Sequence, residues 1–318
     1  MVTRWTVDGV RLPAGLLRRA AVARSGRPAP RMRAATAWTL VALVALCPRR
    51  ARASDGCDWT GSGLDHPESF RGVRPVYLRC SQGRVEWRYP RGALRVVLRH
   101  GTSGRDFRGC LRVGPDWAGA RLYLEGRRKL HPLFAPDDGS PLDLLRCFAS
   151  VDGRAALYVE SQPGARLPLR RTASFSYDLR PASKRALADD MEECRPCTEA
   201  EVTTGYCTGD WVLRGTVSAL DHDHSLRRTE ITVRAVRVLR DAAGGLEKSR
   251  GRKTDPAADY YVVHRPLKCG TRAGAGQYLF VGRWLLGYPV VTCAPRYSDW
   301  KKMRRKALVR GTGQCRFD

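Results

Sequence analysis

Short apolar runs, and not long helical patterns, dominate this 318-residue chain. β-branched and aromatic residues gather in brief stretches that Gly, Pro, Asp or Ser separate, which is typical of strands and turns. In the first half the predicted strands are 73–80, 84–89, 93–98, 121–125, 155–160 and 173–179, with a turn at 81–83. Several short strands at this spacing favour an antiparallel β-sandwich.

The second half predicts five further strands, at 211–220, 230–239, 260–264, 277–281 and 290–293. Within 231–238 the pattern partly alternates, with Thr232, Arg234 and Val236 on one face of the strand. The polar, Gly-rich segment 241–258 is predicted to be a long loop. Five strands followed by a helix fit a small closed barrel.

Residues 298–310 form the strongest helix prediction in the chain. Ser298 is placed to cap the helix, and one apolar stripe runs along it. The stripe consists of Trp300, Met303, Ala307 and Leu308. Basic residues occupy most of the remaining surface.

A hydrophobic leader precedes all of these elements. Its apolar run, 34–47, has a basic start and is followed by Ala51-Arg52-Ala53, which is the layout of a secretory signal. The run is too short to span a bilayer, and no later segment is apolar for that length. Residues 1–31 are either an upstream extension before a start at Met32 or a long basic n-region of the signal peptide. Both alternatives predict a mature, secreted chain that begins near Ser54.

Eleven cysteines are present, and removal of the leader takes away Cys47. The ten that remain are Cys57, Cys80, Cys110, Cys147, Cys194, Cys197, Cys207, Cys269, Cys293 and Cys315. An even number in an exported protein predicts five disulfides. Spacing alone leaves three connectivities open for the first four cysteines and fifteen for the last six.

The same cysteines divide the mature chain. A polar, cysteine-free stretch at 181–193, which is typical of a linker or a short helix, separates the group of four from the group of six. The predicted organisation is therefore a removed leader at 1–53, a sandwich domain at 54–180, a linker at 181–193 and a barrel domain at 194–318.

Two motifs raise the possibility of metal or redox chemistry. Cys194 and Cys197 have the spacing of half a zinc site or of a redox pair, but no second close pair and no βαβ context accompany them, which favours structural disulfides. The stretch 221–224 alternates Asp and His, as a metal site could, but a solvated hairpin is the commoner explanation. No acidic cluster suggests a calcium site.

Signatures of catalysis are missing from the sequence. It contains no nucleophile elbow, no zinc-protease motif and no phosphate-binding loop. We therefore predict a protein that is not an enzyme, with no catalytic residues, no cofactor and no metal.

Charge is the main indication of a binding surface. The net charge is +26 at pH 7 for the whole chain and +16 for the mature chain, where the second half carries most of the excess. Outside the cell such a charge favours sulfated glycosaminoglycans, whereas the leader argues against nucleic acid. The predicted heparin-binding residues are Lys301, Lys302, Arg304, Arg305, Lys306 and Arg310, flanked by Arg296 and the loop 248–253. The competing interpretation is the solvated face of a docked helix.

Six segments together resemble the meteorin and meteorin-like family. They are 57–64 (CDWTGSGL), 77–80 (YLRC), 85–94 (VEWRYPRGAL), 194–197 (CRPC), 207–212 (CTGDWV) and 293–297 (CAPRY). The resemblance covers essentially all of 57–318, and it implies a CUB-like sandwich followed by a netrin-like (NTR) domain built on an OB-type barrel. The chain departs from the family pattern in its many arginines and in Trp211, where Phe is usual.

The resemblance also implies a disulfide pairing. The implied pairs are Cys57–Cys80, Cys110–Cys147, Cys194–Cys269, Cys197–Cys293 and Cys207–Cys315. Each crosslink closes a loop of tens of residues in a domain with a modest core, so each is expected to stabilise its domain.

For function, the resemblance implies a secreted, hormone-like or neurotrophic factor that acts through a cell-surface receptor on glia, neurons or other tissues. Heparan sulfate retention is the further expectation from charge. The alternative is an extracellular inhibitor or matrix modulator that acts through the netrin-like domain. Some such domains inhibit metalloproteinases through a free amino-terminal cysteine, but here more than a hundred mature residues precede Cys194.

Overall fold

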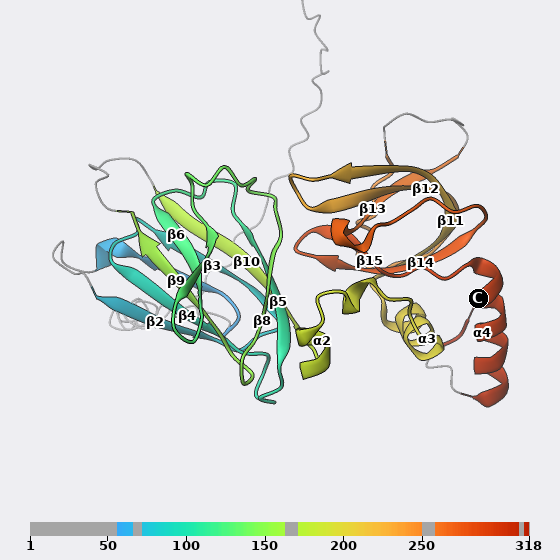
Figure 1. The fold of residues 1–318 in the computed structure, drawn as a ribbon, viewed down its shortest axis with the longest axis horizontal. Coiled ribbons are helices and arrows are strands. Elements are labelled where there is room, and N and C mark those ends of the chain that lie inside the picture. Colours follow the sequence, from blue (N-terminus) through green and yellow to red (C-terminus); the bar gives the residue numbers. More distant parts are fainter. Residues whose placement is uncertain (1–55, 66–71, 163–170, 250–257, 312–314, 318) are drawn as a thin grey trace, which may run out of the picture. The chain divides into compact units, whose positions relative to one another are not determined.

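The computed structural model describes residues 56–65, 72–162, 171–249, 258–311 and 315–317 (Figure 1). The leader, the start at Met32 and the cleavage site near Ser54 lie outside these residues. The chain is mainly β, as predicted, with helices confined to the second half and its approach.

The first ten strands form two five-stranded sheets (Figure 1). One sheet has the order β1 (Trp59–Ser62), β3 (Gln82–Arg88), β10 (Thr172–Pro181), β5 (Phe107–Val113) and β8 (Arg146–Ala149). The other has the order β2 (Val73–Leu78), β4 (Ala93–Leu98), β9 (Ala155–Ser161), β6 (Ala120–Glu125) and β7 (Leu130–Phe134). Pairing is antiparallel except for β1 with β3 and β2 with β4.

Apolar residues from both sheets meet in one core, so the sheets pack face to face as a sandwich. In β4 the alternation is clear, because Leu94, Val96 and Leu98 are buried in this core while Arg95 lies on the opposite face. The predicted turn at 81–83 is shorter than expected. Gln82 and Gly83 already belong to β3, and the chain at this point crosses from one sheet to the other.

The last five strands close into a barrel in the order β11 (Trp211–Asp223), β12 (Arg228–Asp241), β13 (Tyr260–Pro266), β15 (Tyr288–Cys293) and β14 (Tyr278–Leu285). Its interior is a separate apolar cluster that includes Trp211, Leu213, Val233 and Phe280. The closed barrel confirms the coarse prediction for the second half.

Bulges change which residues of β12 face the interior. Arg214 pairs with Arg237 and Gly215 pairs with Ala235, so Val236 is an extra residue in the strand. An extra residue bends a strand and reverses its alternation. Val238 therefore packs on the interior cluster, and Arg237 faces outward on the side of Arg214.

The helices lie before and after the barrel strands. The predicted linker contains α2 (Lys184–Ala188) and the 3-10 turn η2 (Glu192–Cys194), and α3 (Glu199–Thr208) leads into β11. The sequence allowed a short helix within 181–193, where α2 lies, but it did not predict η2 or α3. The short 3-10 turns η1 (Gly63–Asp65) and η3 (Leu267–Cys269) complete the set, together with α4 (Tyr297–Arg310).

The terminal helix forms as predicted, with two corrections. Its cap is Arg296, which makes no capping side-chain hydrogen bond, and Ser298 lies inside the first turn. Trp300 and Ala307 are buried and Met303 packs beside them, but Leu308 is 57% exposed and does not belong to the stripe. A second cluster outside the barrel holds the helix, because Trp300 stacks on Tyr206 of α3 with ring centroids 4.7 Å apart.

Candidate functional site: the crosslinked barrel and its basic helix

Ten described cysteines form five disulfides. The pairs are Cys57–Cys80, Cys110–Cys147, Cys194–Cys269, Cys197–Cys293 and Cys207–Cys315, the same pairs that the resemblance implies. Each pair lies wholly within the sandwich or wholly within the barrel and its helices. Each half therefore carries its own crosslinks.

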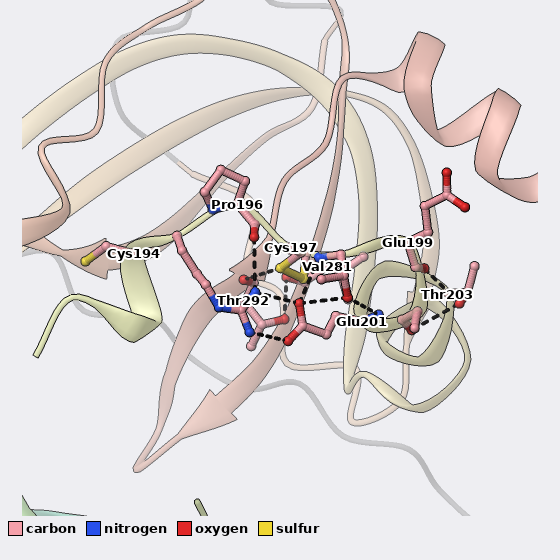
Figure 2. The surroundings of a disulfide bond; sticks show 12 residues. Cys194, Pro196, Cys197, Glu199, Glu201, Thr203, Val281 and Thr292 are labelled. Atoms are coloured by element: carbon pink, nitrogen blue, oxygen red, sulfur yellow. Dashed lines mark hydrogen bonds and ion pairs between the residues drawn. A yellow bond between two sulfur atoms is a disulfide. The ribbon is translucent and has the colours of Figure 1, made fainter. Parts of the chain in front are cut away.

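The segment 194–197 is a branch point, not a redox pair. Cys194 bonds to Cys269 at η3, whereas Cys197 bonds to Cys293 at the end of β15. Figure 2 shows the Cys194 sulfur well apart from that of Cys197, with Pro196 between them. The two cysteines thus tie the entrance of α3 to two different parts of the barrel.

Arg195, between the two cysteines, joins the acidic residues around it. Its Nη1 lies 2.8 Å from Oε2 of Glu201, and its Nε lies 2.9 Å from Oε1 of Glu192. Glu201 completes a capping box at the start of α3, because its Oε2 accepts a 2.8 Å hydrogen bond from the backbone N–H of Thr198. The Arg195 hydrogen bonds, and then the Thr198 N–H, lower the pKa of Glu201 to about 2.

The start of α3 was not predicted, although its signal is present in the sequence. Thr198 followed three residues later by Glu201 is the capping-box spacing. The helix that follows has few apolar residues, and only Val202 and Tyr206 are buried in it. Its amphipathic pattern is therefore too weak to predict a helix.

The six predicted heparin-binding residues do not share one environment. Lys306 forms an ion pair with Glu199 of α3 at 2.6 Å, and this contact lowers the pKa of Glu199. Lys302 lies 3.8 Å from Asp299. These two cations are partly neutralised.

Arg304 is also engaged, because its Nη2 donates a 2.8 Å hydrogen bond to the carbonyl of Phe317. Lys301, Arg305 and Arg310 are exposed and have no carboxylate within ion-pair distance in the part of the chain that the structure describes. The positive electrostatic potential at the helix surface is therefore weaker than its sequence suggested.

The structure places other cations next to the helix. Arg214 of β11 lies over the ring of Tyr297, with its guanidinium carbon 3.9 Å from the ring centroid. Arg296, which the sequence analysis named, lies over Tyr278 at 5.7 Å. Of the loop 248–253, Lys248 is described and pairs with Asp259 at 2.9 Å, while 250–253 lie outside the described residues.

Residues 221–224 belong to the hairpin between β11 and β12. Nδ1 of His222 lies 3.0 Å from the hydroxyl of Thr229 on the neighbouring strand. Asp223 accepts hydrogen bonds from the Ser225 hydroxyl at 2.6 Å and from the Leu226 N–H at 2.9 Å. The Asp223 hydrogen bonds stabilise the turn, and the His222 contact joins the two strands of the hairpin.

Helices of the described residues are all too short or too polar to cross a bilayer. The architecture is that of a disulfide-stabilised, mainly β protein with a two-sheet sandwich and a closed barrel. Family models match both parts: the meteorin-like protein N-terminal domain at residues 59–189 and the meteorin C-terminal domain at residues 196–307.

Similarity to individual proteins spans both parts as well. The chain is 38% identical to the meteorin-like protein of Homo sapiens over 83% of each chain, and 35% identical to that of Xenopus laevis over 83% of this chain and 90% of the other. It is 32% identical to the meteorin of Homo sapiens over 86% of this chain and 93% of that protein. The chain belongs to the meteorin family.

Among solved structures, a periplasmic lysozyme inhibitor of Aeromonas hydrophila matches 34% of this chain and 97% of its own. The TM-score is 0.24 and the sequence identity is 11%, which is too distant to carry a functional conclusion.

Proposed function

We propose that this protein is a secreted signalling factor that acts by binding a receptor on the cell surface. The observation that carries the proposal is the family match, which extends over both halves. Five disulfides support it, since such crosslinks form and persist in the secretory pathway and outside the cell. Glial and neuronal differentiation, axon growth or related tissue signalling is the role that we assign to it.

The same proposal gives each half an identity. Residues 54–180 would be a CUB-like sandwich, supported by the two five-stranded sheets around one core. Residues 194–318 would be a netrin-like domain, supported by the closed barrel and the helices crosslinked to it. Residues 181–193 would connect them.

Retention on heparan sulfate is a further part of the proposal. The net charge of +16 on the chain after the leader and the exposed cations Lys301, Arg305 and Arg310 support it, because sulfated chains are the main polyanions outside cells. Recognition by charge and shape needs no catalytic residue, so the proposed mechanism is binding.

Secretion is tested first. The full chain would be expressed in mammalian cells, and the protein in the medium would be analysed by intact mass and thiol titration. We expect a start near Ser54 and no free thiols. Material that stays in the cells, or that titrates with several thiols, would refute the proposed secretion.

Receptor binding is then tested with the same protein. Labelled protein is added to glial and neuronal cultures before and after heparinase treatment of the cells. We expect saturable binding that persists after heparinase, together with a change in glial differentiation. Loss of all saturable binding, or inhibition of metalloproteinases without any cell response, would favour the inhibitor alternative.

A further inference from the structure

Four cations meet where the first turn of α4 lies beside the barrel strands. We call Arg214, Arg237, Arg296 and Lys301 the aromatic-backed cluster, because tyrosine rings lie under three of them. Only Lys301 and Arg296 were part of the sequence prediction. The other two come from β11 and β12 and reach this place through the barrel fold.

Arg214 is held firmly but keeps its charge. Its guanidinium lies on the ring of Tyr297 at 3.9 Å, and its Nε and Nη2 donate hydrogen bonds of 2.9 and 2.7 Å to Oε1 of Gln277. A ring face and an amide oxygen orient a guanidinium without neutralising it. The remaining N–H groups stay available to an anion.

Arg237 lies directly opposite Arg214 in the ladder between β11 and β12. Like charges opposite each other on one face of a sheet destabilise the pair, since their Cβ atoms are only about 5 Å apart. The bulge at Val236 gives Arg237 this outward direction, and its side chain is exposed. An anion bound between the two guanidinium groups would relieve the repulsion.

Lys301 and Arg296 extend the cluster along the helix start. Nζ of Lys301 lies 5.7 Å from the centroid of the Tyr297 ring, the same ring that backs Arg214. Arg296 lies over Tyr278 and donates a 3.1 Å hydrogen bond to the carbonyl of Ala275. The cations thus follow one another from the strands to the helix.

No member of the cluster has a carboxylate within ion-pair distance among the residues that the structure describes. The nearby acids have other partners, since Asp299 lies against Lys302 and Asp241 accepts backbone N–H bonds from Gly245 and Leu246. The cluster is therefore less neutralised than Lys302 and Lys306, the two cations of the helix that face carboxylates.

We propose that the aromatic-backed cluster binds the sulfate groups of a glycosaminoglycan chain. This inference rests on the proposed retention on heparan sulfate and moves its centre from the outer face of α4 to the helix start. Planar guanidinium groups bind oxyanions through two parallel hydrogen bonds, and those fixed in advance lose little entropy on binding. Two fixed guanidinium groups, Arg214 and Arg296, with Arg237 and Lys301 as further cations, match a polymer that carries repeated sulfates.

Two full-length variants of equal charge test the site. The cluster variant carries Arg214→Gln, Arg237→Gln, Arg296→Gln and Lys301→Gln. The matched control carries Lys302→Gln, Arg305→Gln, Lys306→Gln and Arg310→Gln on the same helix. Both are checked for five intact disulfides and an unchanged thermal midpoint, and binding to heparin is measured at several salt concentrations.

We expect the cluster variant to bind heparin about tenfold more weakly than the unmodified protein, and the control less than about threefold. Equal weakening of both variants would overturn the inference in favour of general charge. Weakening of the control alone would also overturn it, while retention by α4 would stand. Absence of heparin binding by the unmodified protein would overturn both the inference and the retention proposal, without touching receptor binding.

Two further measurements test the role of the Tyr297 ring and the chemical nature of the ligand. Tyr297→Phe keeps the ring under Arg214 and should bind like the unmodified protein, whereas Tyr297→Leu removes the ring and should bind several-fold more weakly. Equal binding by the leucine variant would overturn the role of the aromatic backing. Desulfated heparin should not compete, and binding to phosphatidylserine vesicles as strong as to heparin would overturn sulfate as the ligand.

Discussion

The sandwich and the barrel bury their apolar residues in different ways. The sandwich buries one continuous core between two sheets, whereas the barrel divides its apolar residues between an interior cluster and a second cluster under α3 and α4. The two barrel clusters together hold fewer fully buried side chains than the sandwich core, so they bury less apolar surface and stabilise less. The barrel compensates with three crosslinks against two, and its crosslinks close longer loops.

Sheet edges differ between the two parts as well. A closed barrel has no edge strands, but the sandwich leaves β2 and β7 at the two edges of one sheet. Each of these edge strands contains a proline, Pro75 in β2 and Pro132 in β7. Proline lacks an N–H and cannot extend a ladder, so both edges resist pairing with another chain.

The largest expected effect concerns the longest loop. Replacing Cys207 and Cys315 by Ala should cost about 5 kcal/mol, and replacing Cys57 and Cys80 should cost about 3 kcal/mol, because loop-closure entropy grows with loop length. The sequence separations are 108 and 23 residues. Denaturant unfolding of both double variants measures the difference. Equal losses would show that the barrel does not depend more strongly on its crosslinks.

The next largest loss of stability is expected at a glycine in the barrel. Gly282 of β14 pairs with Trp211 of β11, and a Cβ at this position would overlap the buried indole ring. Gly282→Ala should therefore cost about 3 kcal/mol. Hydrogen exchange should show lost protection in the barrel but not in the sandwich.

Two controls sharpen that prediction. Gly56→Ala, where no atom lies within 4 Å of the added Cβ, should have no such effect. Combining Gly282→Ala with Trp211→Phe should recover part of the loss, because the smaller ring leaves room for the methyl group. A double variant less stable than the sum of the two single changes would contradict the overlap.

A buried tyrosine provides the matching test in the sandwich. The Tyr177 hydroxyl donates a 2.7 Å hydrogen bond to the carbonyl of Cys57, and burial, with a smaller contribution from Asp58, raises the pKa of Tyr177 to about 12. Tyr177→Phe should cost about 1–2 kcal/mol at neutral pH.

The pH dependence of Tyr177 has a definite sign. A pKa that is higher in the folded state than in the unfolded state gives stability that is complete below pH 10 and is lost as the pH rises towards 12. The free energy of unfolding of Tyr177→Phe should therefore fall less steeply over this interval. Identical slopes for the two proteins would exclude this contribution from Tyr177.

The smallest expected effect is at the start of α3. Thr198→Ala removes the cap and should cost about 1 kcal/mol, measured by thermal unfolding. The lowered pKa of Glu201 gives stability that is present above about pH 4.5 and is lost as the pH falls towards 2. Glu201→Gln should flatten that acid limb only slightly, since the group is exposed and salt screens it. A steep change would show that the barrel depends on this cap more than its exposure suggests.

Strand prediction succeeded where apolar and β-branched residues dominate a strand, and it failed where glycine, proline or polar residues interrupt the strand. The core strand β4 was found with its observed bounds, whereas β1, β5, β7 and β8 were missed. In β5, Gly109 interrupts the pattern because the ring of Phe148 fills the space that a side chain would need. In β8 one of the two buried residues is Arg146, which a sequence pattern counts as polar, and the other is Phe148.

The partners that allow Arg146 to be buried cannot be recognised in a local sequence pattern. Its guanidinium is buried and donates hydrogen bonds to the carbonyls of Leu133 at 2.7 Å and Leu144 at 2.7 Å, and it lies over the ring of Phe134 at 4.6 Å. Desolvation lowers its pKa, and the carbonyl oxygens satisfy its donors. Only the folded chain supplies such partners.

The amino-acid order by itself determined the β class, the two groups of cysteines, the terminal helix and the family. These properties depend on local periodicity, on counts or on residues close together in the chain. The tertiary structure decided which cations keep an unneutralised charge, because the partners of Arg214, Lys306 and Arg237 lie on other strands and helices. The sequence shows which residues are charged, but whether a charge is neutralised depends on distances of a few ångströms that only the fold determines.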